Sequence, residues 1–351
     1  MLIEGVFAAV TTPFYADERL YLRKLEANIA HYSRSLLAGM VILGSTGEAV
    51  ALNDEESLQV LRSAAEAAAP EKVLIAGVGR ESLKTTLELA EDAARFKYDA
   101  VLVRTPNYYA SQMSALAVAN YFRSVADRCP LPVLLYNIPR CVPYDIPVDI
   151  VADLAQHPNI IGIKESSGSI EKIRALIAAT RHAPQRTVTV TPIFEAVTER
   201  MMVPASESLD AFVPVGEITG GLAPAATLPA ASLKTRTKQV GFQVLTGSAS
   251  TILESLEAGA SGAILGLASC APQACQEVYF AWKDHDLQLA REKQDRLVRP
   301  NQRVLAEMGI SGVKYACDFN GFYGGYPRLP LLPLTAQEKV EVEQLFADMR
   351  N

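Results

Sequence analysis

Short apolar segments rich in β-branched residues recur along this 351-residue chain at a nearly constant interval, and this rhythm restricts its fold more than any other feature. Val41, Val73, Val101, Val133 and Ile161 mark five of them and are spaced by 32, 28, 32 and 28 residues. Apolar runs of this length between turn formers indicate buried strands. The runs are Gly5–Phe14, Met40–Gly44, Lys72–Val78, Asp99–Thr105, Pro132–Asn137, Ile160–Lys164, Phe242–Gly247 and Gly262–Leu267.

Amphipathic segments separate these runs. Asn53, followed by three acidic residues, predicts the start of a helix that runs to about Ala69, because Asn caps helices and acids favour the first turn. Glu81–Phe96 and Ser114–Cys129 also have helical spacing of apolar residues. Alternating strands and helices at about 30 residues per unit predict an α/β protein, a (β/α)8 TIM barrel. The alternative is an open doubly wound sheet, but no glycine-rich phosphate turn follows the first strand.

The rhythm is interrupted once. Ile161 and Gln243 are 82 residues apart, roughly 50 more than one unit needs. We therefore predict a barrel over 1–270 with an insertion between strands six and seven at about 181–235, and a C-terminal helical region over 271–351. The insertion contains the alternating stretch Thr187–Thr191 and ends in the Ala/Pro/Gly-rich Gly220–Ala226. We expect it at the C-terminal face of the barrel or beside the seventh helix, as a lid, an oligomer contact or a decoration without catalytic role.

Charge and composition exclude several classes of protein. A net charge of −6 and a pI near 5.4 argue against binding nucleic acid or an anionic membrane through bulk charge. No apolar run is long enough to span a membrane. The five cysteines form no C-x-x-C pair, and Met1–Phe14 does not read as a signal peptide, so we expect a cytoplasmic protein. The four histidines are scattered, and we expect neither a catalytic metal nor another cofactor.

Lys164 ends the apolar run that begins at Ile160. A lysine inside a fold must be paired or lose its proton, and the neutral amine can attack a ketone to form a Schiff base. The plainer interpretation is a strand-end lysine that reaches water or pairs with Glu165.

Three motifs lie in order at the ends of predicted strands: Gly44–Glu48 (Gly-Ser-Thr-Gly-Glu), Tyr136–Pro139 (Tyr-Asn-Ile-Pro) and Ile163–Gly168 (Ile-Lys-Glu-Ser-Ser-Gly). Together they make the chain resemble the dihydrodipicolinate synthase / N-acetylneuraminate lyase family over its whole length except the insertion. The resemblance implies a TIM barrel and a class I aldolase, a lyase that forms a Schiff base with pyruvate.

The resemblance also implies roles for single residues. Lys164 would form the imine, and Tyr136 would relay protons. Ser45, Thr46 and Gly47 would bind the pyruvate carboxylate, and Gly247 and Ser248 would line its pocket. Tyr108, with Tyr109 as the adjacent alternative, would reach the neighbouring subunit's site, so we expect a homodimer or homotetramer. The plainer alternatives are a helix-capping turn at Ser45–Thr46 and a core tyrosine at Tyr136.

The second substrate is less evident. Phe242–Ala249 and a C-terminal stretch that includes Gly312–Lys314 and Phe322–Gly325 resemble 4-hydroxy-2-oxoglutarate aldolases, although the latter stretch reports ancestry more than substrate. The arginine with which synthases bind their aldehyde substrate's carboxylate is Cys141 here, and Arg140 lies one position early. We therefore predict small-molecule substrates, pyruvate and a 2-oxo acid or aldehyde. The hypotheses are an aldolase for 4-hydroxy-2-oxoglutarate or a similar 2-oxo acid, a dihydrodipicolinate synthase that uses aspartate semialdehyde with Arg140 as the binding group, and a non-catalytic 2-oxo-acid-binding barrel.

Overall fold

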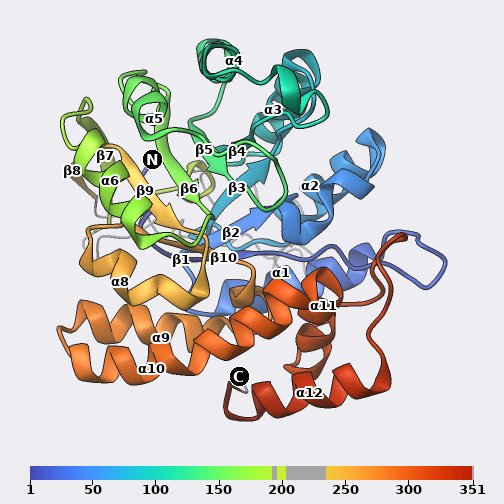
Figure 1. Cartoon of the computed structure of the whole chain (residues 1–351). Coiled ribbons are helices and arrows are strands. Elements are labelled where there is room, and N and C mark those ends of the chain that lie inside the picture. The colour runs from blue at the N-terminus through green and yellow to red at the C-terminus, as the bar shows by residue number, and fades with distance from the viewer. Residues whose placement is uncertain (192–195, 203–234, 350–351) are drawn as a thin grey trace, which may run out of the picture.

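Eight parallel strands close into a barrel, as the thirty-residue rhythm predicts (Figure 1). The computed structural model describes residues 1–191, 196–202 and 235–349. Around the barrel the strands follow the order β1, β10, β9, β6, β5, β4, β3, β2, so the first strand pairs with the last. Their bounds are β1 Gly5–Ala9, β2 Gly39–Ile42, β3 Val73–Gly77, β4 Ala100–Arg104, β5 Val133–Asn137, β6 Ile160–Glu165, β9 Gln243–Thr246 and β10 Gly262–Leu265.

Alternate residues of each strand are buried on opposite sides, which is why the strands are mostly apolar rather than half polar, with polar residues mainly at their ends. Leu102 of β4 and Leu134 of β5 fill the interior of the barrel. Val101, Val103 and Leu135 belong instead to the cluster formed with the surrounding helices. The layer of helices therefore covers a barrel that is filled by side chains, except near its mouth.

The helices confirm the predicted segments. Asn53 accepts from Glu56 N, and the Glu56 side chain accepts from Asn53 N, which makes the start of α2 a capping box. The helices that alternate with strands are α1 Leu22–Arg34, α2 Asp54–Ala67, α3 Leu83–Arg95, α4 Ala115–Arg128, α5 Val148–Leu154, α6 Ile170–Thr180 and α8 Ile252–Glu257. Among the described residues, no helix is both long and apolar enough to cross a membrane.

Four further helices follow the last strand: α9 Pro272–Lys283, α10 Leu287–Pro300, α11 Gly309–Phe319 and α12 Ala336–Phe346. They lie together along one side of the barrel, coloured orange to red in Figure 1. Helix α9 packs against β1 and α8, α10 packs against α9, and α11 contacts α12. A π-helical turn over Asn301–Glu307 joins α10 to α11.

The insertion lies at the amino-terminal end of the barrel in the part that the structure describes. Strand β7 (Arg186–Val190), within the alternating stretch, pairs in antiparallel fashion with β8 (Arg236–Val240). Val188 and Val190 pack on Leu2, and Lys238 pairs with Glu4, just before β1. The expected position at the C-terminal face is wrong here, because the segment follows α6, which has already returned the chain to the opposite end. Gly220–Ala226 lies outside the described residues.

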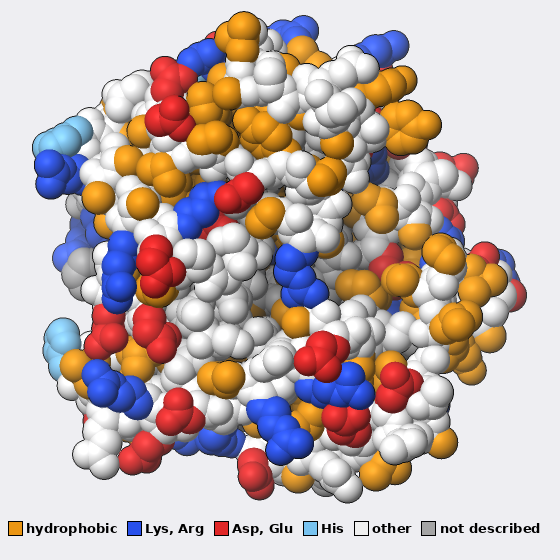
Figure 2. Space-filling view, viewed as in Figure 1, with side chains coloured by type: hydrophobic (Ala, Val, Ile, Leu, Met, Phe, Trp, Pro, Cys, Tyr) orange, Lys and Arg blue, Asp and Glu red, His pale blue; other side chains and the backbone are white. Residues whose placement is uncertain are grey.

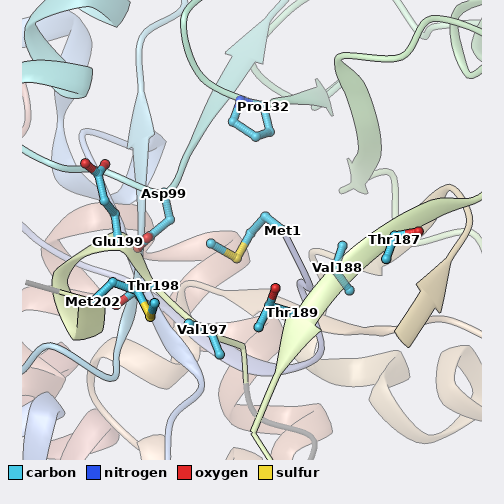
Figure 3. A pocket seen from close by; sticks show the side chains of 10 residues that line it. All are labelled: Met1, Asp99, Pro132, Thr187, Val188, Thr189, Val197, Thr198, Glu199 and Met202. Atoms are coloured by element: carbon cyan, nitrogen blue, oxygen red, sulfur yellow. The ribbon is translucent and has the colours of Figure 1, made fainter. Parts of the chain in front are cut away.

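A cavity of about 390 Å³ lies between the insertion and the barrel end. Figure 3 shows Met1 between Asp99 and the β7 residues Val188 and Thr189. Asp99 is buried just before β4, and Arg200 of the insertion lies 3.5 Å from its carboxylate. Arg200 also donates to the carbonyls of Lys97 and Lys72, so one side chain attaches the insertion to the strands β3 and β4.

Arg200→Met should destabilise the fold in a pH-dependent way. Burial raises the pKa of Asp99 above 3.8, and Arg200 opposes that shift, so removing Arg200 raises this pKa further. A carboxyl group whose pKa is higher in the folded than in the unfolded state favours the fold fully below its unfolded pKa, and this contribution is lost as pH rises from the unfolded to the folded pKa. The deficit should be about 3–5 kcal/mol at pH 7 and should shrink towards pH 4.

Urea unfolding at pH 7 and at pH 4 measures this deficit in the free energy of unfolding. Lys84→Met removes an ion pair with Glu88 in which both side chains are more than half exposed and is the control, with a small deficit at either pH. Equal deficits of Arg200→Met at pH 7 and pH 4 would contradict the account.

Candidate active site

Lys164 and Tyr136 meet at the carboxyl ends of neighbouring strands. They are paired in the register of β5 and β6, so their side chains leave the barrel wall at the same level. Lys164 is only 4% exposed, and its Nζ donates to Tyr136 Oη over 3.1 Å. The same nitrogen lies 4.2 Å from the centre of the Tyr136 ring. Within the described part of the chain no carboxylate forms an ion pair with Lys164, so the predicted alternative pairing with Glu165 is not observed.

Ser45 joins this pair from the turn that follows strand β2. Its Oγ lies 3.5 Å from Tyr136 Oη, which gives a row of three polar groups across the mouth of the barrel. Ser45–Gly47 forms a short 3-10 turn, with Gly47 N donating to Gly44 O. Thr12 donates to Gly47 O over 2.7 Å and fixes the turn to the segment after β1. A Cβ at Gly47 would lie 2.9 Å from Val10 O, so the turn can approach β1 this closely only with glycine.

A buried polar network lies behind Lys164. The Glu165 side chain is fully buried and accepts from Asn137 Nδ2 and Ser167 N, at 2.8 and 2.6 Å. Lys172 lies 3.6 Å from it and also pairs with Asp145. Asn137 donates to Asp145 as well. The network thus connects the end of β6 to the segment after β5 and rigidifies the wall from which Lys164 projects.

Gly247 and Ser248 follow β9 on the far side of Lys164. Gly247 N donates to Glu165 O over 2.7 Å. A Cβ at Gly247 would lie 1.8 Å from Ser166 Oγ, so a larger residue there would displace Ser166. Ser248 caps the turn Ala249–Thr251 by accepting from Ser250 N. Ser166 was not predicted, although its position two residues after Lys164 places both on one side of the strand.

A cavity of about 590 Å³ opens beside this row of polar groups. Figure 2 shows the face presented in Figure 1 hollowed near its middle, with charged side chains of both signs around the hollow. Arg80 and Arg104, which no motif in the sequence indicates, also line the cavity. The lining residues are Leu43, Gly44, Ser45, Ala49, Val50, Leu52, Gly77, Gly79, Arg80, Glu81, Leu102, Arg104, Asn107, Tyr108, Tyr136, Cys141, Val142 and Ile310. In the described ranges no group of three His, Cys, Asp or Glu side chains is arranged to hold a metal ion.

A family model described as the dihydrodipicolinate synthetase family matches residues 2–186 and 225–349. The chain belongs to this family. Its members are class I aldolases or lyases that form Schiff bases with pyruvate, and the chain is therefore an enzyme of this kind. The match spans the barrel strands and the C-terminal helices and omits residues 187–224 in the insertion.

Curated relatives of the chain include both synthases and aldolases. The chain is 28% identical to the 4-hydroxy-tetrahydrodipicolinate synthase of an Exiguobacterium species, over 97% of this chain and 96% of that one. It is also 28% identical to a probable mitochondrial 4-hydroxy-2-oxoglutarate aldolase of Emericella nidulans, over 99% and 95%. A dihydrodipicolinate synthase of Acinetobacter baumannii, solved with pyruvate, is 25% identical, with 99% of both chains covered and a TM-score of 0.78.

Arg140 and Cys141, the two neighbouring positions considered for binding a substrate carboxylate, point in different directions. Cys141 lines the cavity, and its side chain is exposed. Arg140 Nη2 donates to Ala306 O over 2.7 Å, in the π-helical turn before α11, and Arg140 is not among the lining residues. The structure thus brings Cys141, rather than the neighbouring cation, to the wall of the cavity.

Tyr108 is not brought into the row of Lys164, Tyr136 and Ser45. It is 80% exposed at the edge of the cavity, and its ring contacts that of Tyr109, which is also exposed. The backbone N–H groups of Asn107 and Tyr108 both donate to Glu81, which pairs with Arg104. Burial alone would raise the pKa of Glu81, but these donors lower it overall. The segment that carries Tyr108 is therefore held by an ionised carboxylate while its ring points outward.

Proposed function

We propose that Lys164 is the Schiff-base lysine of a pyruvate-dependent aldolase that acts on 4-hydroxy-2-oxoglutarate or a similar 2-oxo acid. The contact of Lys164 Nζ with Tyr136 Oη inside the barrel mouth carries this proposal. The neutral amine attacks the ketone carbon, and loss of water gives an iminium that draws electrons from the bond between C3 and C4. That bond breaks, the C4 hydroxyl proton leaves and an aldehyde is released. Protonation of the enamine at C3 and hydrolysis return pyruvate and Lys164.

Tyr136 carries protons in these steps, since its hydroxyl contacts both Lys164 Nζ and Ser45 Oγ. Ser45, Thr46 and Gly47 offer hydroxyl and backbone N–H groups to the substrate carboxylate next to the ketone. Gly247 and Ser248 form the opposite wall, where the absence of a side chain at Gly247 leaves room for Ser166.

Borohydride added with pyruvate tests the assignment of Lys164. One reduced pyruvyl group per chain should appear on the peptide that contains Lys164. In Tyr136→Phe the same adduct should form about 10²–10⁴-fold more slowly, because only the proton-carrying oxygen is removed. Labelling of Lys164→Ala equal to wild type would exclude Lys164, and a slowing of less than about tenfold in Tyr136→Phe would exclude its role in proton transfer.

We also propose that Tyr108 completes the proton relay in the site of a second subunit, within a cytoplasmic homodimer or homotetramer. The ring at the cavity edge supports this role, because Glu81 holds its backbone and the ring stays 80% exposed within the described chain despite its contact with Tyr109.

Mixing inactive Tyr108→Phe with inactive Lys164→Ala should restore activity. A mixed dimer has one site with Lys164 from the first chain and Tyr108 from the second, so up to about half of the mixed dimers' sites would be complete. Mass spectrometry of the mixed oligomer confirms subunit exchange. Exchange without recovered activity would show that Tyr108 acts in its own subunit or not at all.

The choice between the two candidate substrates rests on Cys141, which lines the cavity. A carboxylate that enters a cavity needs a fixed cation or several donors, and a thiol does not replace an arginine fork. Because Arg140 is bound to Ala306 O, we expect kcat/KM for cleavage of 4-hydroxy-2-oxoglutarate to exceed that for condensation of pyruvate with aspartate semialdehyde by at least about 10²-fold.

Cys141→Arg should raise the condensation rate, and Arg140→Ala should leave both rates near those of the wild type. Steady-state kinetics of both reactions on the three proteins give the comparison. Efficient condensation by the wild type that is lost in Arg140→Ala would identify the enzyme as the synthase.

A further inference from the structure

A second buried lysine, Lys314 of helix α11, lies directly behind the turn that carries Ser45. Its Nζ is 2.5 Å from Glu48 Oε1, and the two side chains are 1% and 2% exposed. Lys314 also donates to Tyr326 O over 2.6 Å and lies 4.3 Å from the centre of the Phe14 ring. Burial lowers the pKa of Lys314, and the Glu48 carboxylate opposes that shift. Helix α11 thus places one buried charged side chain against the residue that follows the turn Ser45–Gly47 at the mouth of the barrel.

Glu48 has an unusual backbone conformation that requires such support. Its φ of 54° and ψ of 33° lie in the left-handed region, which costs free energy for any residue with a Cβ. Glu48 N donates to Ser45 O, so this conformation closes the turn over Ser45–Gly47. Its second carboxylate oxygen accepts from Arg328 N over 2.9 Å. Both oxygens of one side chain are therefore held by the C-terminal region.

Two glycines make the contact possible. A Cβ at Gly324 would lie 1.9 Å from Lys314 O, so the chain can cross α11 at this point only with glycine. Gly325 has a φ of 72°, and a Cβ there would lie 2.8 Å from Phe14 O. The crossing brings Tyr326 O to Lys314 and Arg328 N to Glu48. Lys314, Gly324 and Gly325, which belong to the C-terminal stretch that resembles the aldolases, are thus arranged around one ion pair.

The side chain of Arg328 extends the same attachment. It binds both carboxylate oxygens of Glu56 in the first turn of α2 and the carbonyl of Ala51. The turn, the segment after it and the start of α2 are therefore all fixed from one side by the residues around Lys314.

We propose that Lys314 is a positioning residue for the substrate carboxylate, which acts through Glu48 by holding Ser45–Gly47 in the shape that receives pyruvate. This inference rests on the proposed function, in which that turn binds the carboxylate. The competing interpretation is an ion pair that stabilises the fold alone. The two differ in whether pyruvate binding changes when the pair is replaced without loss of stability.

The experiment measures borohydride-trapped adduct on Lys164 against pyruvate concentration, together with thermal unfolding. Lys314→Met leaves a buried carboxylate unpaired and should lower Tm. Adding Glu48→Gln removes that charge and should recover Tm, because a buried pair can be replaced by neutral groups of similar shape. Both proteins should need about tenfold more pyruvate for half-saturation, as changes in groups that orient a site do, with one adduct per chain at saturation.

The control is the double variant Arg303→Gln with Glu341→Gln. It removes an ion pair of 2.7 and 2.9 Å between the π-helical turn and α12, which does not involve Glu48. Its half-saturation should equal that of the wild type, whatever its Tm. If the double variant at positions 48 and 314 does not fold, Glu48→Gln alone, which removes the carboxylate and keeps the shape of the side chain, is compared with the wild type at a temperature at which both are folded.

Wild-type half-saturation in a folded variant without the pair would overturn the inference and leave the pair a structural one. Absence of a Lys164 adduct in the wild type would overturn the proposed function and the inference with it. The two failures are therefore distinguished by the wild-type protein alone.

Discussion

Closure of the barrel is the constraint on which the rest of this structure depends. Strands β1 and β10 must pair although they lie at opposite ends of the barrel sequence, and a Cβ at Gly262 would lie 2.1 Å from Gly5 O. Once the ring is closed, every strand ends at the same mouth. Lys164 and Tyr136 then meet because the register of β5 and β6 places them side by side. Local chain geometry alone would not bring Ser45 to the same point.

Closure also buries polar groups, and each of them has to be compensated. At the mouth Glu165 is held by Asn137, Ser167 and Lys172, and Glu48 is held by Lys314. At the opposite end Asp99 is held by Arg200. Such pairs contribute little net stability compared with apolar residues of the same volume, since desolvation offsets most of the attraction. Their effect is to fix where segments lie, and the segments fixed here are the turn at Ser45, the wall behind Lys164 and the insertion.

The sequence predicts features that depend on local spacing. The strands, the cap at Asn53 and the ends of β2, β5 and β6 follow from apolar periodicity and turn residues, so Ser45, Tyr136 and Lys164 could be placed together before the fold was known. The end of the barrel at which the insertion lies could not be predicted in this way, because it depends on whether the insertion comes before or after α6. The ion pair between Lys314 and Glu48 could not be predicted either, since nothing in local spacing connects these two residues. The direction in which the Arg140 side chain points could not be predicted either, because it is set by a hydrogen bond to Ala306 O in the C-terminal region.

The positions of the five cysteines make one of them suitable for selective chemical labelling. Cys129, Cys270, Cys275 and Cys317 are buried, and burial raises the pKa of Cys129 and Cys270, which makes these two poor nucleophiles. Cys141 is exposed and lies in the cavity wall. A fluorophore coupled through this sulfur would lie in the cavity wall, and its emission would report when the cavity fills. A bulky group attached there by a disulfide would occupy the cavity until a reductant removes it.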